Sequence, residues 1–594
     1  MTFLFVIVIL SVAQTATGDW INLSGAQSAP NIAEIYVEED HVRLVLEIYI
    51  DDMGQFADLL PESFFKDVEV SIAPIDERLK HFSKQTFQVI ADEKRHLPVR
   101  LKLIEPRLRI HRPNPFAGKI NPYTRQIIPG PPEDKRVLYA ELIYPFKDKP
   151  KTLVFIPLMD EQGRQSVSMG FIAYHKGVPV VDYRYIPQSL LLHLDWEDPW
   201  YTRFDSRVLT RWLLSGMKTF LYIEPYEVRH ETMVRVRDIE AWMDLDLRGD
   251  AFIEIDENET VKKKIGAFLL THSHVLIDGK KYRPILDRTS FVKYTMTRTF
   301  FLEQPERIPL NTAMIGVIVT YVTMGIPQEV TVDWDLFNDR IQKVPTNAVD
   351  PAGPFPSFIT PDDNIFKWTN HLKTYQMPTV AEIKVDAALM HVNVPVGSIL
   401  CLLFLFPLGL LTVRRVKNGK PVVPMVIMTV VMIAGSVFLY PYLNVAVARP
   451  GLMMPKLEHQ DAISVLNSLL KNVYRSFDFR EEADVYDRLA TSVTGDLLAD
   501  IYLQNRKSLK VTQAGGAQAR VKEIKILDVS VDHIDDRPLA LVFHSKWTAM
   551  GTVGHWGHIH TRKNQYEANI TVEPLDGAWK ITDLELLEEK RIDP

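Results

Sequence analysis

Two long apolar runs, residues 394–413 and 421–443, constrain the fold more than any other feature of the sequence. Each run is about 20 residues long without a formal charge, and at about 1.5 Å per residue a helix of that length matches a hydrocarbon layer about 30 Å thick. A buried core helix would show a polar face, and neither run does. Because a lipid-exposed backbone must satisfy its own hydrogen bonds, we expect two transmembrane helices joined as a hairpin.

The short segment between the runs, residues 414–420, predicts the orientation of this hairpin. It carries four cations, Arg414, Arg415, Lys417 and Lys420. Short loops rich in Lys and Arg remain in the cytoplasm. We therefore expect a cytoplasmic loop at 414–420, with transmembrane helices at 394–413 and 421–443 and with both flanking regions on the opposite side of the membrane.

The N-terminus agrees with an exported chain. An apolar segment at residues 3–12 is too short to span a bilayer, and Ala16, Thr17 and Gly18 provide small residues where a signal peptidase cuts. No Lys or Arg precedes the apolar segment, which departs from the usual charged start. A short buried strand is the alternative to the expected signal peptide at 1–18.

Composition limits the partners and the ways in which the outer domains are stabilised. The net charge of −7 and the absence of a long basic run argue against nucleic acid. The single cysteine, Cys401, lies in the first apolar run, so no intramolecular disulfide can form. The expected outer domains must be stabilised by their own cores, and a length of 594 residues suggests several of them.

Residues 19–344 have the two-residue period of half-buried strands. In residues 42–50 the even positions are aliphatic and the odd positions are mostly polar or amphipathic, and similar short runs recur up to residue 322, separated by turn residues. This pattern favours two β-sandwich domains, at 19–204 and 205–344. The Pro-rich sequence that follows predicts an extended linker at 345–393, with a short amphipathic piece near residues 366–375.

Residues 455–594 have the pattern of a separate α+β domain. Apolar residues recur at helical spacing up to Phe477, two more helices are expected at 481–490 and 494–509, and four long alternating strands follow. This order, ending in Gly577-Ala-Trp-Lys-Ile581, resembles the nuclear transport factor 2-like cone fold. The resemblance implies a curved sheet covered by helices. It does not choose a function, because that superfamily includes isomerases, dehydratases and plain binding or assembly modules.

The most distinctive chemical motif in this domain is the histidine cluster His555, His558 and His560. Three imidazoles supply enough nitrogen for Zn²⁺ or Cu, and His558 and His560 lie two residues apart, so on a strand they face the same way. His555 is out of phase with them on a regular strand unless a bulge or turn at Gly557 brings it round. We therefore favour a hairpin with hydrogen-bonded histidines over a metal site.

A catalytic or ligand pocket inside the cone would need a carboxylate base and an opposing donor. The available candidates are Tyr474, Asp478, Tyr486, Asp487 and His544. Nothing in the sequence shows that they converge, and we expect no catalytic residues.

Three further clusters favour structural interpretations. We expect turn chemistry and aromatic packing at Asp195, Glu197 and Asp198, which offer too few carboxylates for a calcium loop. The charged residues of 224–231 predict a solvated edge or an interdomain ion-pair patch. His272 and His274 share the two-residue spacing of a strand without a third ligand nearby in sequence, so we expect an exposed strand face.

These features together predict a two-pass protein of a bacterial inner membrane, with both large regions on the periplasmic side. Its expected partners are the bilayer, other proteins, or further copies of the chain that pack on a small-residue helix face at residues 434–436. We favour an interaction or assembly scaffold without a cofactor. The alternatives are a Zn or Cu handling protein using the three histidines, and a small-molecule binder or isomerase-like enzyme using the cone pocket.

Overall fold

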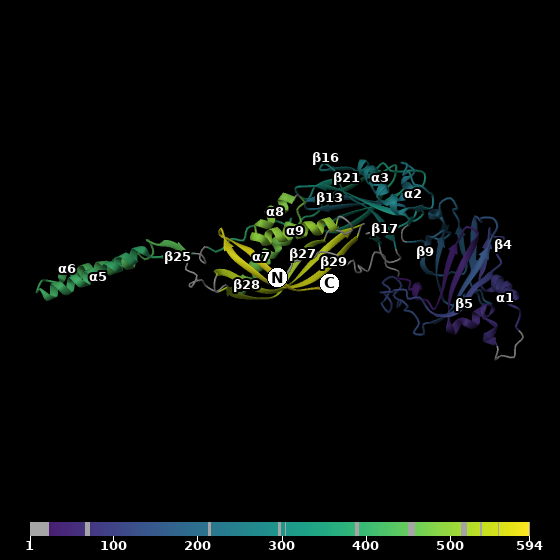
Figure 1. Ribbon diagram of the computed structural model, residues 1–594, viewed down its shortest axis with the longest axis horizontal. Coiled ribbons are helices and arrows are strands. Elements are labelled where there is room, and N and C mark those ends of the chain that lie inside the picture. The colour runs from purple at the N-terminus through teal and green to yellow at the C-terminus, as the bar shows by residue number, and fades with distance from the viewer. Residues whose placement is uncertain are drawn as a thin grey trace.

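The computed structural model describes residues 23–65, 72–211, 215–294, 299–302, 304–386, 391–448, 458–480, 482–512, 519–534, 537–555 and 558–592. The expected signal peptide at 1–18 lies outside these residues. The described chain is an extended row of parts, with a helical hairpin at one end and an N-terminal β domain at the other (Figure 1). The C-terminal domain lies between the hairpin and a second β domain.

Domain 1, residues 23–211, is built from two sheets with a shared apolar core. Aliphatic residues of one sheet, such as Ile35 and Leu44, and residues of the other, such as Val89 and Phe155, are buried together. This arrangement follows from the two-residue period, because each strand has one apolar face to bury. The first sheet has the strand order β5 (Arg100–Leu108), β6 (Arg136–Pro145), β2 (His41–Tyr49), β1 (Asn31–Val37), β8 (Met169–His175) and β9 (Val178–Tyr185). The second has the order β11 (Arg203–Phe204), β10 (Leu190–His193), β7 (Thr152–Ile156), β3 (Gln88–Ala91) and β4 (Arg95–His96), and helix α1 (Ile75–His81) lies beside it.

Domain 2, residues 215–369, also buries two main sheets against each other, with Val317 and Trp334 among the core residues. The larger has the order β18 (Thr299–Phe301), β17 (Ile285–Tyr294), β20 (Met314–Val322), β13 (Glu227–Arg235), β12 (Met217–Glu224), β22 (Val344–Asp350) and β23 (Gly353–Ile359). The smaller has the order β16 (Lys280–Lys281), β15 (His274–Ile277), β21 (Glu329–Asp333) and β24 (Ile365–Thr369). A short pair, β14 (Phe252–Ile253) with β19 (Ile308–Pro309), and helices α2 (Val236–Ile239) and α3 (Asn258–Thr271) complete the domain.

Two expectations for this region are wrong. The predicted linker at 345–393 and its amphipathic piece instead contain β22, β23 and β24, so domain 2 extends to residue 369. Pro354 and Pro356 are tolerated because β23 is an edge strand, where a missing N–H breaks no ladder. His272 and His274 do not share a strand either, since Thr271 ends α3 and His274 begins β15.

The C-terminal domain is α+β, as expected, with its helices first. Leu466 and Val473 of α7 pack with Phe543 and Ile570 of the sheet in one core. Asp576 and Gly577 both have positive φ, which suits the two-residue turn between the last strands. The helices are α7 (His459–Ser476), α8 (Glu482–Ala490) and α9 (Gly495–Thr512). The antiparallel sheet runs β27 (Ala519–Ile534), β28 (Arg537–His555), β29 (His558–Leu575) and β30 (Ala578–Ile592).

The helical hairpin consists of α5 (Val396–Lys417) and α6 (Val423–Leu439), and it continues into a two-stranded ribbon of β25 (His391–Val394) and β26 (Val445–Ala448). By length and composition α5 is, among the described helices, the one able to cross a membrane, whereas α6 has 17 residues and is shorter. The first helix extends beyond the expected end at Val413, so Arg414, Arg415 and Lys417 belong to its last turn rather than to a loop.

Candidate functional site

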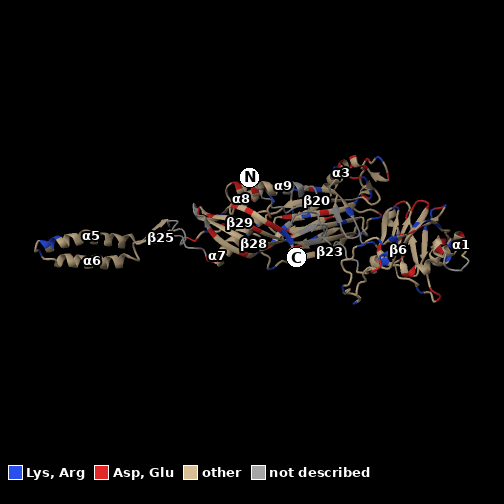
Figure 2. Cartoon of the chain, turned by 60° about the horizontal axis from the view of Figure 1, so that its bottom comes forward, with Lys and Arg blue, Asp and Glu red and all other residues tan. Residues whose placement is uncertain are grey.

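The hairpin presents apolar side chains to its surroundings. Most of its large apolar residues are exposed, and Phe406 and Val437 keep 74% and 72% of their surface. An apolar surface of this extent on a protein surface marks contact with lipid or another protein. The four cations lie together at the far tip of the hairpin (Figure 2). Gly419, with φ of 65°, allows the chain to turn there.

Small residues hold the two helices of the hairpin together. The Ser398 hydroxyl donates to the Ser436 carbonyl at 2.6 Å. A Cβ on Gly397 would lie 2.8 Å from that of Leu443, and one on Gly435 would lie 3.6 Å from the Cys401 sulfur. The small residues near 434–436 thus serve, at least in part, to pack α6 against α5 within one chain.

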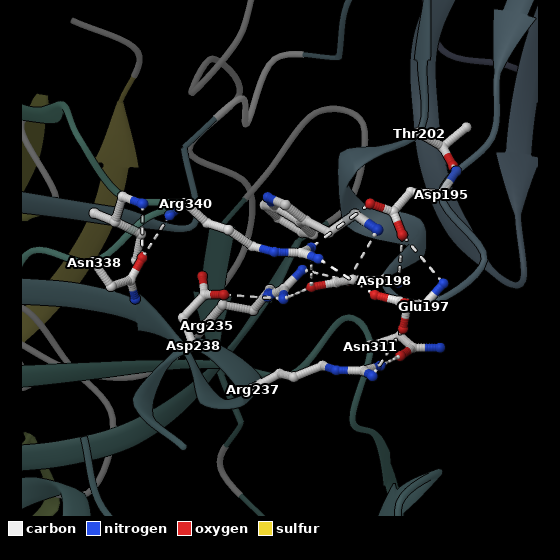
Figure 3. Close-up of polar contacts among 12 residues, drawn as sticks. Asp195, Glu197, Asp198, Thr202, Arg235, Arg237, Asp238, Asn311, Asn338 and Arg340 are labelled. Carbon is white, nitrogen blue, oxygen red and sulfur yellow. Dashed lines mark hydrogen bonds and ion pairs between the residues drawn. The ribbon is translucent and has the colours of Figure 1, made fainter. Parts of the chain in front are cut away.

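The first junction connects domain 1 to domain 2 through buried charges. Arg235 has no exposed surface, and its guanidinium pairs with Asp198 of domain 1 and, at 3.0 Å, with Asp238 of domain 2. Figure 3 shows Arg235 and Arg340 converging on Asp198, with Arg237 beside them. Burial opposes ionisation of Asp198, but Arg235 outweighs it and lowers its pKa. Burial raises the pKa of Asp238 despite the same arginine.

Turn chemistry at residues 195–198 positions this junction, as the sequence predicted. The Asp195 carboxylate accepts from the backbone N–H groups of Glu197 and Asp198, at 3.1 and 2.9 Å. Asp198 in turn caps the backbone N–H of Trp200 at 3.2 Å. The ion pair with Arg235 is a further role that local sequence could not reveal, since the two residues lie 37 positions apart.

The second junction connects domain 2 to the C-terminal domain around Glu227. This carboxylate has no exposed surface, pairs with Arg480, and accepts from Arg520 at 2.6 Å. Arg520 also pairs with Glu224. Burial alone would raise the pKa of Glu227, but Arg480, Arg520 and Arg229 hold it well below its usual range. The charged residues of 224–231 are therefore an interdomain ion-pair patch and not a solvated edge.

Aromatic and backbone contacts extend the second junction. The rings of Tyr226 and Phe479 stack with centroids 4.2 Å apart, and the Tyr226 hydroxyl donates to the Pro378 carbonyl at 2.6 Å. Asp478 lies in the same region with only 8% of its surface exposed. Burial raises its pKa to about 6, although Arg520 opposes that shift.

Residues 378–386, which precede the hairpin, are part of the C-terminal domain. The Val385 N–H donates to the Gly577 carbonyl and the Trp579 N–H to the Ile383 carbonyl, both at 2.8 Å. The Asn472 side chain donates to the Ala381 carbonyl at 2.7 Å. The segments before and after the hairpin therefore meet in one domain.

The histidines of the C-terminal cluster lie on two strands, not one. The register pairs His555 of β28 with His558 of β29, and His560 follows on β29. The phase argument against His555, which assumed a single strand, thus does not apply. The side chains of His555, His558 and His560 lie outside the described residues.

The candidate pocket residues are not brought together. The Tyr474 hydroxyl lies 3.5 Å from the Trp547 ring nitrogen in the core, and burial raises the pKa of Tyr474 to about 12. Asp478 belongs to the second junction. Tyr486 and Asp487 are exposed on α8, and His544 is exposed on β28, where it contacts Asn569 and Asp532.

Comparison with known proteins adds little to this geometry. Neither a protein-family model nor a curated protein matches the chain. Among solved structures, the intermembrane space region of the chloroplast protein ARC6 matches at 18% identity over 22% of this chain and 98% of that chain, with a TM-score of 0.17. A likeness at this level assigns neither a fold nor a function.

Proposed function

We propose that the chain is a membrane-anchored scaffold of the bacterial inner membrane, held by a two-pass hairpin, with both large regions on the periplasmic side. The observation that carries the proposal is the meeting of the two segments that flank the hairpin. Lys384 forms a β-bridge with Ala578, so both must lie on one side of any membrane that the hairpin enters. An odd number of crossings is incompatible with that contact.

Helix lengths and charges support a double crossing. At about 1.5 Å per residue, the 22 residues of α5 extend about 33 Å. The 17 residues of α6 extend about 26 Å. Hydrocarbon layers are about 30 Å thick, and small mismatches cost little. The cations at the tip favour a cytoplasmic turn.

The two junctions support an assembly role in place of catalysis. Buried ion pairs connect three domains in a row, and this specifies their relative positions. The candidate pocket residues lie apart from one another. The proposal includes a nuclear transport factor 2-like fold for the C-terminal domain. A scaffold of this kind presents partner surfaces at set distances from the bilayer.

Reporter fusions at Lys384, Asn418 and Lys590 test the topology. We expect a reporter that is active only outside the cytoplasm to work at Lys384 and Lys590 and to fail at Asn418, and a cytoplasmic reporter to give the reverse pattern. Activity of the extracytoplasmic reporter at Asn418, or its failure at Lys590, would refute the two-pass arrangement. Replacing the four tip cations with Gln gives a matched variant in which the orientation signal alone is removed.

The metal-handling alternative remains tied to His555, His558 and His560. Their cross-strand register removes the main geometric objection to it. Zinc binding by the full chain, lost on replacing these three residues by Gln, would favour that alternative over the plain scaffold.

A further inference from the structure

Three metal-ligating side chains converge on the surface of domain 2, outside both junctions. His272 and His274 flank Ser273 at the turn from α3 to β15, and Asp335 follows β21 in the adjacent part of the sheet. The ligand atoms of the three residues all lie within 4.8 Å of one another. From this geometry we propose that His272, His274 and Asp335 form a binding site for a divalent first-row transition metal ion such as Zn²⁺.

The distances suit such an ion. The Asp335 Oδ2 atom lies 2.8 Å from His272 Nδ1 and 3.5 Å from His274 Nε2. Zinc bonds to imidazole and carboxylate of about 2.0–2.2 Å place tetrahedral ligand atoms about 3.3–3.5 Å apart, so small side-chain rotations complete the site. Two neutral imidazoles and one carboxylate favour Zn²⁺ and its neighbours over Mg²⁺ or Ca²⁺, which prefer oxygen.

A buried polar chain positions the two histidines. Ser273, between them, points inward, and its hydroxyl lies 2.6 Å from His230 Nδ1 and 2.9 Å from the Tyr321 hydroxyl. The Tyr321 hydroxyl also donates to the Ser273 carbonyl at 2.9 Å. Because Ser273 lies between His272 and His274 at the turn from α3 to β15, anchoring its side chain fixes the backbone from which both imidazoles project.

The third proposed ligand, Asp335, lies in a loop that is also fixed by hydrogen bonds. Trp334, immediately before Asp335, is buried in the core of domain 2 and its backbone N–H donates to the Asn364 carbonyl at 3.0 Å. The Trp334 ring nitrogen donates to the Leu336 carbonyl at 3.1 Å. The Asp335 carbonyl accepts from the Phe337 N–H, also at 3.1 Å. The loop that carries the carboxylate is therefore fixed on both sides of Asp335.

The surroundings leave part of the coordination shell open. The side chains of His274 and Asp335 keep 52% and 41% of their surface exposed. The His272 ring packs on the Phe268 ring. Three protein ligands with an accessible fourth position resemble an open zinc site, in which water or a ligand from outside completes the shell. A bound ion would link the end of α3 and the start of β15 to the loop after β21.

The test is zinc binding by the full chain, purified in detergent micelles with a histidine-free tag and stripped with a chelator. Titration calorimetry with Zn²⁺ should give one site per chain. His274→Gln and Asp335→Asn should each weaken binding at least about tenfold. Ser273→Ala, which removes the hydroxyl that fixes the backbone between the histidines, should weaken binding by less than the loss of either ligand. Co²⁺ should give the visible absorption of a low-coordinate site, and a chelator should abolish that absorption.

Two controls distinguish this site from others. His81→Gln removes another surface histidine that contacts a carboxylate, Asp58, and should leave zinc binding unchanged. Replacement of His555, His558 and His560 by Gln should also leave it unchanged. Zinc affinity that survives both His274→Gln and Asp335→Asn, loss of binding in the triple variant alone, or no binding by the wild-type chain would overturn the proposal. Circular dichroism melts of each variant check that it remains folded.

Discussion

Replacing Asp478 with Asn should stabilise the C-terminal domain at neutral pH. Burial raises the pKa of Asp478 from 3.8 to about 6 in the folded protein. The charged carboxylate is therefore disfavoured by folding, so this residue lowers stability above about pH 6, and that loss is recovered as the pH falls toward 3.8. Asn has no charge to bury and avoids the cost at every pH.

The size of the effect follows from the two pKa values. Their difference is about 2.2, and at about 1.36 kcal/mol for each pKa unit this corresponds to an upper limit of about 3 kcal/mol at about pH 7.5. This limit already includes the attraction to Arg520, which opposes the pKa shift, and how well the amide fits in place of the neutral acid sets how much of it is reached. We expect a gain of about 1–3 kcal/mol at about pH 7.5, and almost none at about pH 4.

Calorimetric melting of the full chain in detergent at several pH values provides the assay. Asp487→Asn is the matched control, because Asp487 lies exposed on α8 in the same domain and its replacement should change little at any pH. Comparing each variant with the wild-type chain at one pH cancels the titration of all other groups. A variant Asp478→Asn that melts at the wild-type temperature near neutral pH, or whose advantage persists at about pH 4, would refute the reasoning.

Further predictions concern the junctions and the domain boundary. Glu227→Gln should destabilise the second junction by about 3–5 kcal/mol, because it leaves buried arginines without their carboxylate, and faster proteolysis between domain 2 and the C-terminal domain should report it. Arg235→Met should weaken the contact between domains 1 and 2, and X-ray scattering should then give a larger radius of gyration. Arg248→Met, which removes an exposed ion pair, should leave the radius of gyration unchanged. A soluble fragment of residues 455–594 should melt below one that also carries residues 378–386 in place of the hairpin, because Ile383 and Val385 then pack on the core; equal melting temperatures would contradict this.

Most strands and helices with regular apolar periods were predicted from the sequence, with α3 as an exception. The strand at residues 42–50 was expected and β2 covers His41–Tyr49, because its alternation directly reflects burial on one face. Helix α3 was missed, although Val261, Ile265 and Leu269 recur every four residues and Glu254 and Glu257 form a capping box before it. Polar residues between apolar positions four apart are the pattern of an amphipathic helix, so the sequence did contain this signal.

Contacts between distant segments were beyond sequence reasoning for a different physical reason. Asp335 lies about 60 residues after His272, and only the pairing of β15 with β21 brings the two together. Likewise, the Pro-rich sequence from residue 345 predicted an extended linker, yet residues 353–359 form an edge strand, which tolerates proline. In both cases the deciding information is the order of strands in a sheet, which local patterns do not contain.

The position of the hairpin within the fold has a mechanical consequence for the proposed scaffold. Since residues 378–386 belong to the C-terminal domain, the hairpin is an insertion into that domain and not a tail attached to it. The strands β25 and β26 pair at the base of α5 and α6, and a paired ribbon bends and rotates less freely than a single strand of the same length. The second junction connects the C-terminal domain to domain 2 through Glu227, and the first junction connects domain 2 to domain 1 through Arg235. In the proposed scaffold these two junctions would set how far domain 1 stands from the bilayer, and breaking either buried ion pair would remove that control.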